Sequence, residues 1–175
     1  MRRFDLAVMA LAAIGITGFA ESAIASAADE CMHSFGSHQQ LADGGASVQE
    51  WTVTDLKKSA DPAPGYPLAG QLWEATASVK AVSGTVTPII PNFSAFTADG
   101  RTYQVLWQLA SPHGLPGATI VQGQTSTGKL YFDATGPDPV AVTYTVGAGH
   151  PLMWCSCDAM TATPMAAMEN CSCCS

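Results

Sequence analysis

The stretch Leu72-Trp73-Glu74-Ala75-Thr76-Ala77-Ser78-Val79-Lys80-Ala81-Val82 decides the fold class. Trp73, Ala75, Ala77, Val79 and Ala81 are apolar, and the residues between them are polar or charged. Because side chains alternate between the two faces of an extended chain, this pattern predicts a β-strand with one face covered by a core. The small alanines leave room for bulky groups packed opposite, and the four tryptophans of the chain can supply them.

Downstream of this strand, a hairpin is predicted at Asp99-Gly100. Alternating runs over residues 92–97 and 101–109 flank this dipeptide, and both of its residues tolerate a positive φ. In the second run, alternation places Trp107 on the same face as Tyr103, Val105 and Leu109. Leu106 interrupts the other face, which suggests a strand covered on both sides.

Further strands are predicted over residues 48–56, 129–134, 140–146 and 152–154, and the prolines fall between the runs. With no helical period beyond the first residues, the chain is expected to be all-β. We predict an immunoglobulin-like antiparallel β-sandwich of about seven to eight strands over residues 48–154. No cysteine lies between Cys31 and Cys155, so the disulfide that joins core strands in antibody domains is absent.

The first 27 residues have the features of a cleavable export signal. Arg2 and Arg3 precede an apolar run over residues 6–20, and Ala25-Ser26-Ala27 fits the cleavage rule. The run is shorter than the roughly 20 residues of a membrane span. We therefore expect a secreted protein with no stable membrane anchor after cleavage. Residues 28–47 are polar and glycine-rich and are predicted to form a flexible lead-in.

The charge of the chain limits its partners. The formal net charge is −7, and it is unchanged in the 148 residues that remain after cleavage, because the signal carries two basic and two acidic residues. Such a chain is a poor partner for nucleic acid or an anionic membrane surface. An extracellular or host protein is the expected kind of partner.

Several blocks of sequence resemble one known family. They are Gly65-Tyr66-Pro67, Gly70-Gln71-Leu72-Trp73-Glu74-Ala75-Thr76, Thr97-Ala98-Asp99-Gly100, Val105-Leu106-Trp107-Gln108, Gly117-Ala118-Thr119-Ile120 and Ser126-Thr127-Gly128-Lys129-Leu130-Tyr131-Phe132-Asp133. Together, and in this order, they resemble the MPT-sixty-three-like immunogenic extracellular proteins of mycobacteria, from about Trp51 to Trp154. The resemblance implies a secreted immunoglobulin-like sandwich of unassigned biochemical function, known as an antigen. It implies no catalytic residues.

The sequence predicts no enzyme and no cofactor. Residues 123–129 match the spacing of a phosphate-binding loop, but Leu130 replaces the Ser or Thr that would hold magnesium, and a strand follows instead of a helix. We therefore interpret residues 123–129 as an ordinary loop. The four histidines lie in the lead-in or beside prolines, and the carboxylates form no close pair in the sequence.

The cysteines leave alternatives open. All six are candidates for disulfides, the default in an oxidising compartment: Cys31, Cys155, Cys157, Cys171, Cys173 and Cys174. Cys31 could reach Cys155 or Cys157 if the first and last strands lie at neighbouring edges. The Cys/Met-rich tail, residues 155–175, could instead bind copper or zinc. The candidate ligands are Cys155, Cys157, Cys171, Cys173, Cys174 and Met160.

Two functions thus follow from the sequence. The first is a non-enzymatic secreted protein whose sandwich presents loops and strand edges to a partner. The second is an extracellular protein that binds a soft metal through its tail.

Overall fold

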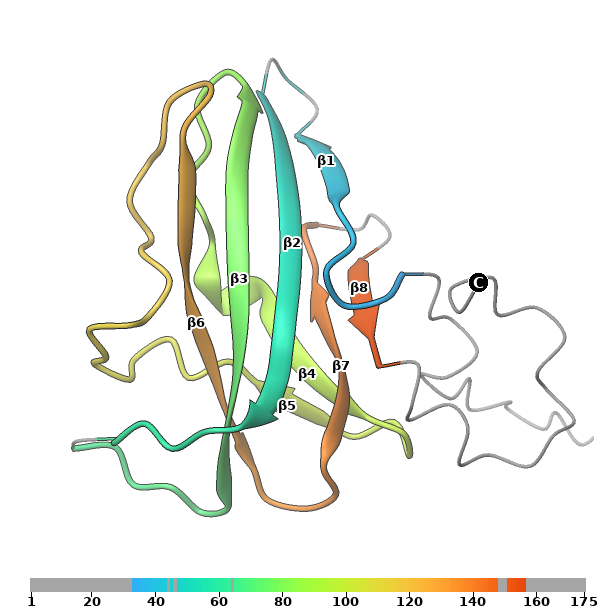
Figure 1. Ribbon diagram of the computed structural model, residues 1–175, viewed down its shortest axis with the longest axis vertical. Coiled ribbons are helices and arrows are strands. Elements are labelled where there is room, and N and C mark those ends of the chain that lie inside the picture. Colours follow the sequence, from blue (N-terminus) through green and yellow to red (C-terminus); the bar gives the residue numbers. More distant parts are fainter. Residues whose placement is uncertain (1–32, 44, 46, 64, 148–150, 157–175) are drawn as a thin grey trace, which may run out of the picture.

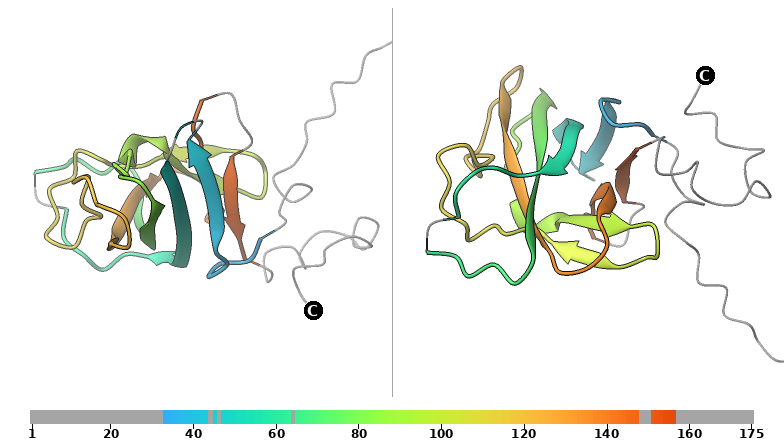
Figure 2. Two further views of the ribbon diagram at one scale, coloured as in Figure 1. Left: turned by 90° about the horizontal axis from the view of Figure 1, so that it is seen from above. Right: turned by 60° about the horizontal axis from the view of Figure 1, so that its bottom comes forward.

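Two antiparallel β-sheets packed face to face make up the described part of the chain (Figure 1). The structure is a computed structural model, and it describes residues 33–43, 45, 47–63, 65–147 and 151–156. Figure 2 shows the two layers from above and from below. Within these residues the regular elements are β-strands and one short 3-10 turn, η1 (Ile90–Asn92), which lies directly before β4. The predicted all-β immunoglobulin-like sandwich is confirmed.

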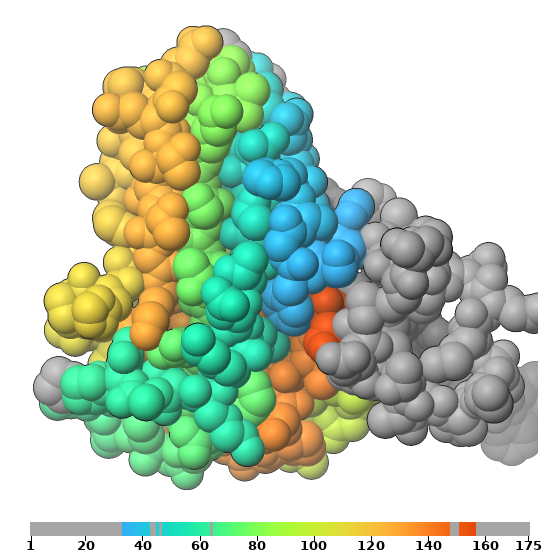
Figure 3. Space-filling model, viewed as in Figure 1, coloured from blue at the N-terminus to red at the C-terminus, as the bar shows by residue number. Residues whose placement is uncertain are grey.

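The first sheet is centred on the alternating stretch that predicted the fold. It has the order β1-β2-β3-β6, with β1 at Gln39–Asp43, β2 at Ser47–Lys58, β3 at Gln71–Ser83 and β6 at Thr125–Ala134. Ala75, Ala77, Val79 and Ala81 of β3 are buried, as the period of two requires. In Figure 3 this sheet faces the viewer, with the yellow loop that follows β5 standing beside β6.

The second sheet has the order β5-β4-β7-β8. Its strands are β4 (Phe93–Thr97), β5 (Thr102–Gln104), β7 (Pro139–Tyr144) and β8 (Leu152–Cys155). The predicted hairpin joins β4 to β5, with Ser94 opposite Gln104 and a φ of +83° at Gly100. That backbone conformation costs glycine nothing and most other residues energy, which explains the Asp-Gly turn.

Large aromatic side chains fill the space opposite the alanines of β3. Trp51 of β2 packs edge-on against Phe93 at 5.1 Å between ring centroids, and it lies 4.6 Å from Tyr144. Trp154 of β8 is completely buried in the same core. The small side chains of β3 thus leave space that the large aromatic side chains of the core fill. This complementary packing gives the sandwich the density of a native protein interior.

At both sides of the sandwich, the chain connects the two sheets. On one side Ser34 forms a parallel bridge with Cys155, and the Gln39 side chain donates to the Met153 carbonyl at 2.7 Å. On the other side Val105 bridges Phe132 of β6. The Leu106 N–H then donates to the Tyr131 carbonyl at 2.7 Å. The two sheets are therefore held together by hydrogen bonds at their edges as well as by the packing of the core.

Three expectations need correction. Residues 39–43 of the predicted lead-in form β1, because their backbone completes the ladder of β2 from Gln39 to Asp43. The run 101–109 is a strand only to Gln104, since the chain crosses to β6 at Val105, and Trp107 is exposed instead of sharing the buried face. The predicted loop 123–129 is already part of β6 from Thr125 onward.

The described residues contain no helix long and apolar enough to cross a membrane. The predicted signal, residues 1–27, lies outside them.

Candidate binding pocket beside strand β6

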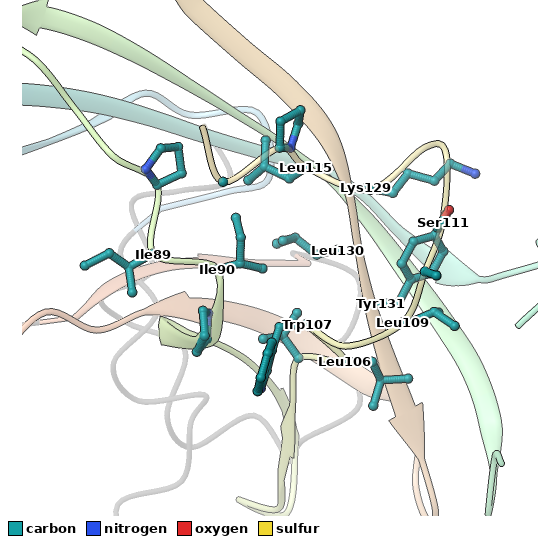
Figure 4. Close-up of a pocket in the computed structure, with 17 residues that line it drawn as sticks. Ile89, Ile90, Leu106, Trp107, Leu109, Ser111, Leu115, Lys129, Leu130 and Tyr131 are labelled. Atoms are coloured by element: carbon teal, nitrogen blue, oxygen red, sulfur yellow. The ribbon is translucent and has the colours of Figure 1, made fainter. Parts of the chain in front are cut away.

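A pocket of about 590 Å³ opens beside β6, at the point where the chain crosses between the sheets (Figure 4). Ile89 and Ile90 lie at one end of the pocket, and Ser111 and Tyr131 lie at the other. The lining comes from the segment before β4, the loop after β5 and β6. It comprises Pro88, Ile89, Ile90, Pro91, Val105, Leu106, Trp107, Leu109, Ala110, Ser111, Gly114, Leu115, Pro116, Gly117, Lys129, Leu130 and Tyr131.

One wall of the pocket is a loop that pairs with β6. The Lys129 N–H donates to the His113 carbonyl at 2.7 Å, and the Leu115 N–H donates to the Lys129 carbonyl at 2.9 Å. Gly128 makes this approach possible, because a Cβ there would stand 2.4 Å from the Leu115 Cα. A strand glycine commonly marks such a close backbone contact. Gly128 thus fixes the position of the loop, and Leu115 is buried beneath it.

The opposite wall is held by a short backbone bridge and by prolines. Val86 and Ile120 exchange two backbone hydrogen bonds, at 2.8 and 3.0 Å, and the hydroxyls of Thr87 and Thr119 lie 2.7 Å apart. Pro88 and Pro91, which follow Thr87 in the sequence, line this wall, and Pro116 lines the wall formed by the loop. Since each proline ring fixes φ, these walls lose little further freedom when a ligand binds.

Two large apolar side chains stand exposed at the mouth of the pocket. Trp107 is 59% exposed and Ile89 is 49% exposed. Leu130 and Leu115, which are buried, and Leu106, which is partly buried, line the same space (Figure 4). A half-open pocket lined mostly by apolar residues, with an exposed indole at its mouth, is a candidate ligand site.

Behind the polar end lies a network of charged groups on the outer side of β3 and β6. The Lys129 ammonium contacts Asp61 at 2.8 Å and Glu74 at 3.0 Å. The Ser59 hydroxyl donates to the same oxygen of Glu74 at 2.6 Å. The Glu74 side chain is only 8% exposed, so its carboxylate depends on these partners. Lys129 lines the pocket with its stem, and its nitrogen points away from the cavity (Figure 4).

These contacts shift the protonation equilibria of the network. Hydrogen bonds from Lys129 and Tyr131 lower the pKa of Asp61. Hydrogen bonds to Asp61 and Glu74 raise the pKa of Lys129 well above its ordinary value. Burial, followed by the bond to Asp61, raises the pKa of Tyr131. At neutral pH the network therefore holds an ammonium, a carboxylate at Asp61 and a neutral phenol.

The direction of the hydrogen bonds at the polar end can be assigned. Tyr131 has one hydroxyl proton and donates it to Asp61 at 2.6 Å. The 2.9 Å contact between the hydroxyls of Ser111 and Tyr131 must then use the Ser111 proton. The His113 N–H donates to the Ser111 oxygen at 3.2 Å. Both hydroxyl protons are consequently committed, and what remains at this end of the pocket is acceptor capacity on Ser111 and Tyr131.

The residues that the sequence singled out lie elsewhere. Cys155 is buried at the end of β8, beside Ala141 and Met153. The other candidates, Cys31, Cys157, Met160, Cys171, Cys173 and Cys174, lie outside the described residues. Among the residues that are described, no group of three or more His, Cys, Asp or Glu side chains could hold a metal ion.

The pocket was missed in the sequence because most of its residues come from two irregular segments, which join β6 only in the folded chain. The sequence Thr87-Pro88-Ile89-Ile90-Pro91 carries two adjacent isoleucines between prolines, which fits no strand with one covered face. That combination of apolar residues in a proline-fixed loop was the available signal. Trp107 gave no signal of a pocket, since its alternation with Val105 and Leu109 is typical of a buried strand.

Comparison with known proteins supports the resemblance found in the sequence. The model of a domain of unknown function, DUF1942, matches residues 30–154. The chain is 49% identical over 155 residues to the immunogenic proteins MPT63 of Mycobacterium tuberculosis and MPB63 of Mycobacterium bovis, covering 88% of this chain and 96% of each relative. The crystal structure of MPT63, described as a secreted protein of M. tuberculosis, is 51% identical and superposes with a TM-score of 0.67, covering 70% of this chain and 95% of that one. The chain therefore belongs to the DUF1942 family, with the mycobacterial immunogenic proteins MPT63 and MPB63 among its relatives.

Proposed function

We propose that this protein is a secreted, non-enzymatic, immunogenic binding protein, and that it binds its partner outside the cell through the pocket beside β6. The observation that carries the proposal is the pocket of about 590 Å³, lined mostly by apolar residues, with Trp107 and Ile89 exposed at its mouth. Its volume falls in the range of small-ligand sites, roughly 300–1,000 Å³. An extracellular or host partner is consistent with the relatives, one of which is titled a secreted protein.

The chemistry of the polar end supports binding over catalysis. A nucleophilic serine needs a neutral base beside it, and Ser111 contacts Tyr131, whose pKa is raised, and a backbone N–H. Lys129 keeps its proton because two carboxylates hold it. The groups nearest the pocket are thus committed to one another, which suits a rigid binding site.

The test is saturable binding of an uncharged apolar fluorophore, N-phenyl-1-naphthylamine, to the exported protein. We expect one site per chain, weakened at least roughly tenfold by Trp107→Asp or Ile89→Asp. Val121→Asp is the matched control, because Val121 is 53% exposed and lies outside the pocket lining. Equal loss in all three variants, or no saturable binding in the unmodified protein, contradicts the proposal. A detected turnover of any bound compound contradicts its non-enzymatic part.

A further inference from the structure

We infer that the pocket is built for an uncharged, largely apolar small molecule that carries a hydroxyl or N–H donor at one end. This inference rests on the proposed function and names the class of ligand for the same site. The donor end would lie at Ser111 and Tyr131, and the apolar body would extend past Leu130 to Ile89 and Trp107 (Figure 4).

We expect an uncharged ligand because the charged groups near the pocket are already paired with one another. Lys129 is the charged residue of the lining, and its ammonium is turned away from the cavity and bound to Asp61 and Glu74. A carboxylate or ammonium held against the apolar side chains would lose part of its hydration, and the Lys129 ammonium is already paired with two carboxylates. Burying an unpaired charge is far more costly than burying a hydrogen-bonded neutral group. The pocket therefore selects against ions of either sign.

The requirement for a donor follows from the hydrogen bonds at the polar end. The Tyr131 proton is committed to Asp61, and the Ser111 proton to Tyr131. The Ser111 oxygen keeps one lone pair after accepting from His113. A ligand oxygen without hydrogen would face these lone pairs unpaired, whereas a hydroxyl or N–H would donate to them. Leaving a buried polar group unpaired costs about 1–3 kcal/mol.

The shape of the site favours a small molecule over a peptide strand. The edge of β6 that borders the pocket already pairs with His113 and Leu115 through Lys129, so at these positions it offers no free ladder to an extended peptide. The close contact of Gly128 with Leu115 holds that wall in place. What stays open is a half-open pocket, and the paired edge of β6 borders it.

Four compounds of one shape test the inference by displacing N-phenyl-1-naphthylamine from the exported protein at neutral pH. These are 2-naphthol, 2-methoxynaphthalene, 2-naphthoate and 2-naphthylmethylammonium. We expect 2-naphthol to bind most tightly, with a Kd at least roughly tenfold below those of both ions. It should also bind at least roughly fivefold more tightly than the methoxy compound, as expected for one unpaired acceptor.

Ser111→Ala supplies the second readout. The ratio of the two Kd values, 2-naphthol against 2-methoxynaphthalene, should fall toward one in this variant, while the fluorophore still binds. Because both Kd values come from the same variant, a general loss of stability does not alter the ratio.

Failure of the inference differs from failure of the proposed function. Fluorophore binding with equal affinity for the ions and for 2-naphthol overturns the inference and leaves the pocket as a binding site. An unchanged ratio in Ser111→Ala likewise overturns it. Absence of fluorophore binding overturns both. Displacement by an apolar peptide but by none of the four naphthalenes would assign the pocket to a protein partner and overturn the inference.

Discussion

Gly128 shows how much a single position contributes to the site. A Cβ at this position would stand 2.4 Å from the Leu115 Cα, so any side chain would push the loop away from β6. We expect Gly128→Ala to lower the free energy of unfolding by about 1–3 kcal/mol, the usual range for overpacking. It should also weaken binding of the apolar fluorophore.

Gly117→Ala is the matched control for this change. A Cβ at Gly117 would meet only the Pro88 carbonyl, at an ordinary 3.8 Å, although the residue lines the same pocket. Urea unfolding of the two variants measures the difference. Equal stability of the two variants would show that Gly128 does not position the loop.

Lys129 is the second residue on which a testable expectation rests. Lys129→Met keeps the stem along the pocket but leaves Asp61 and the buried Glu74 without their ammonium. Lys57→Met is the control, since Lys57 reaches Glu74 only at 3.9 Å and is 62% exposed. We expect the melting temperature to fall clearly for Lys129→Met and little for Lys57→Met. A larger loss in the Lys57 variant would contradict the assigned network.

The lowered pKa of Asp61 contributes to the pH dependence of stability, as do the lowered pKa values of Glu50 and Asp99. A carboxyl whose pKa is lower in the folded than in the unfolded chain binds fewer protons when folded, so its stabilisation is present above the unfolded value of about 4. That stabilisation is lost as the pH falls through the folded value. Unfolding free energies measured from pH 7 downward should therefore decline below about pH 4. The decline should be shallower in Lys129→Met, because Lys129 is the largest cause of the shift.

At the scale of elements, strand β1 and the residues before it attach to β8. The Cys155 N–H donates to the His33 carbonyl at 3.0 Å, and the Phe35 N–H donates to the Cys155 carbonyl at 3.2 Å. Cys31 lies two residues before His33 in the sequence and outside the described residues. Two residues of extended chain span about 7 Å, a reach that suits a disulfide. We expect a Cys31–Cys155 disulfide in the protein purified under non-reducing conditions.

Peptide mapping of the non-reduced protein checks this pairing. A peptide containing Cys155 linked to one containing Cys31 is the expected product. A link from Cys155 to Cys171, Cys173 or Cys174 would contradict it. Treatment with a reducing agent should lower the melting temperature, because the bridge would tie the start of the chain to the last strand.

The elements that could be predicted are those in which local pattern and packing agree. The strand over residues 72–82 and the Asp99-Gly100 turn are determined by side-chain alternation and backbone conformation, which the sequence displays directly. Strand β1 could not be predicted, because its backbone pairs with β2 and its Gln39 side chain donates to the Met153 carbonyl, more than 100 residues away. Trp107 is exposed because the chain changes sheets at Val105, a tertiary event that leaves no period in the sequence. The pocket depends on that crossing and was not predicted either.

At the scale of the whole molecule, the four tryptophans divide into one exposed and three buried residues. Trp107 is 59% exposed, whereas Trp51, Trp73 and Trp154 are buried in the core. We expect acrylamide to quench one class of fluorescence readily, and Trp107→Phe to remove that class while leaving the rest. Ready quenching that survives in Trp107→Phe would mean that the core is looser than described.

The arrangement of the outer strands bears on how the protein behaves at high concentration. Unpaired strand edges are templates for adding strands from other molecules, and long flat edges are the greatest hazard. Here β1, β5 and β8 have only five, three and four residues. β6 is the long outer strand, and the loop around Leu115 pairs with it at Lys129. The loop that forms the wall of the pocket therefore also covers part of the edge of β6, so we expect its displacement to promote aggregation as well as to weaken the proposed binding.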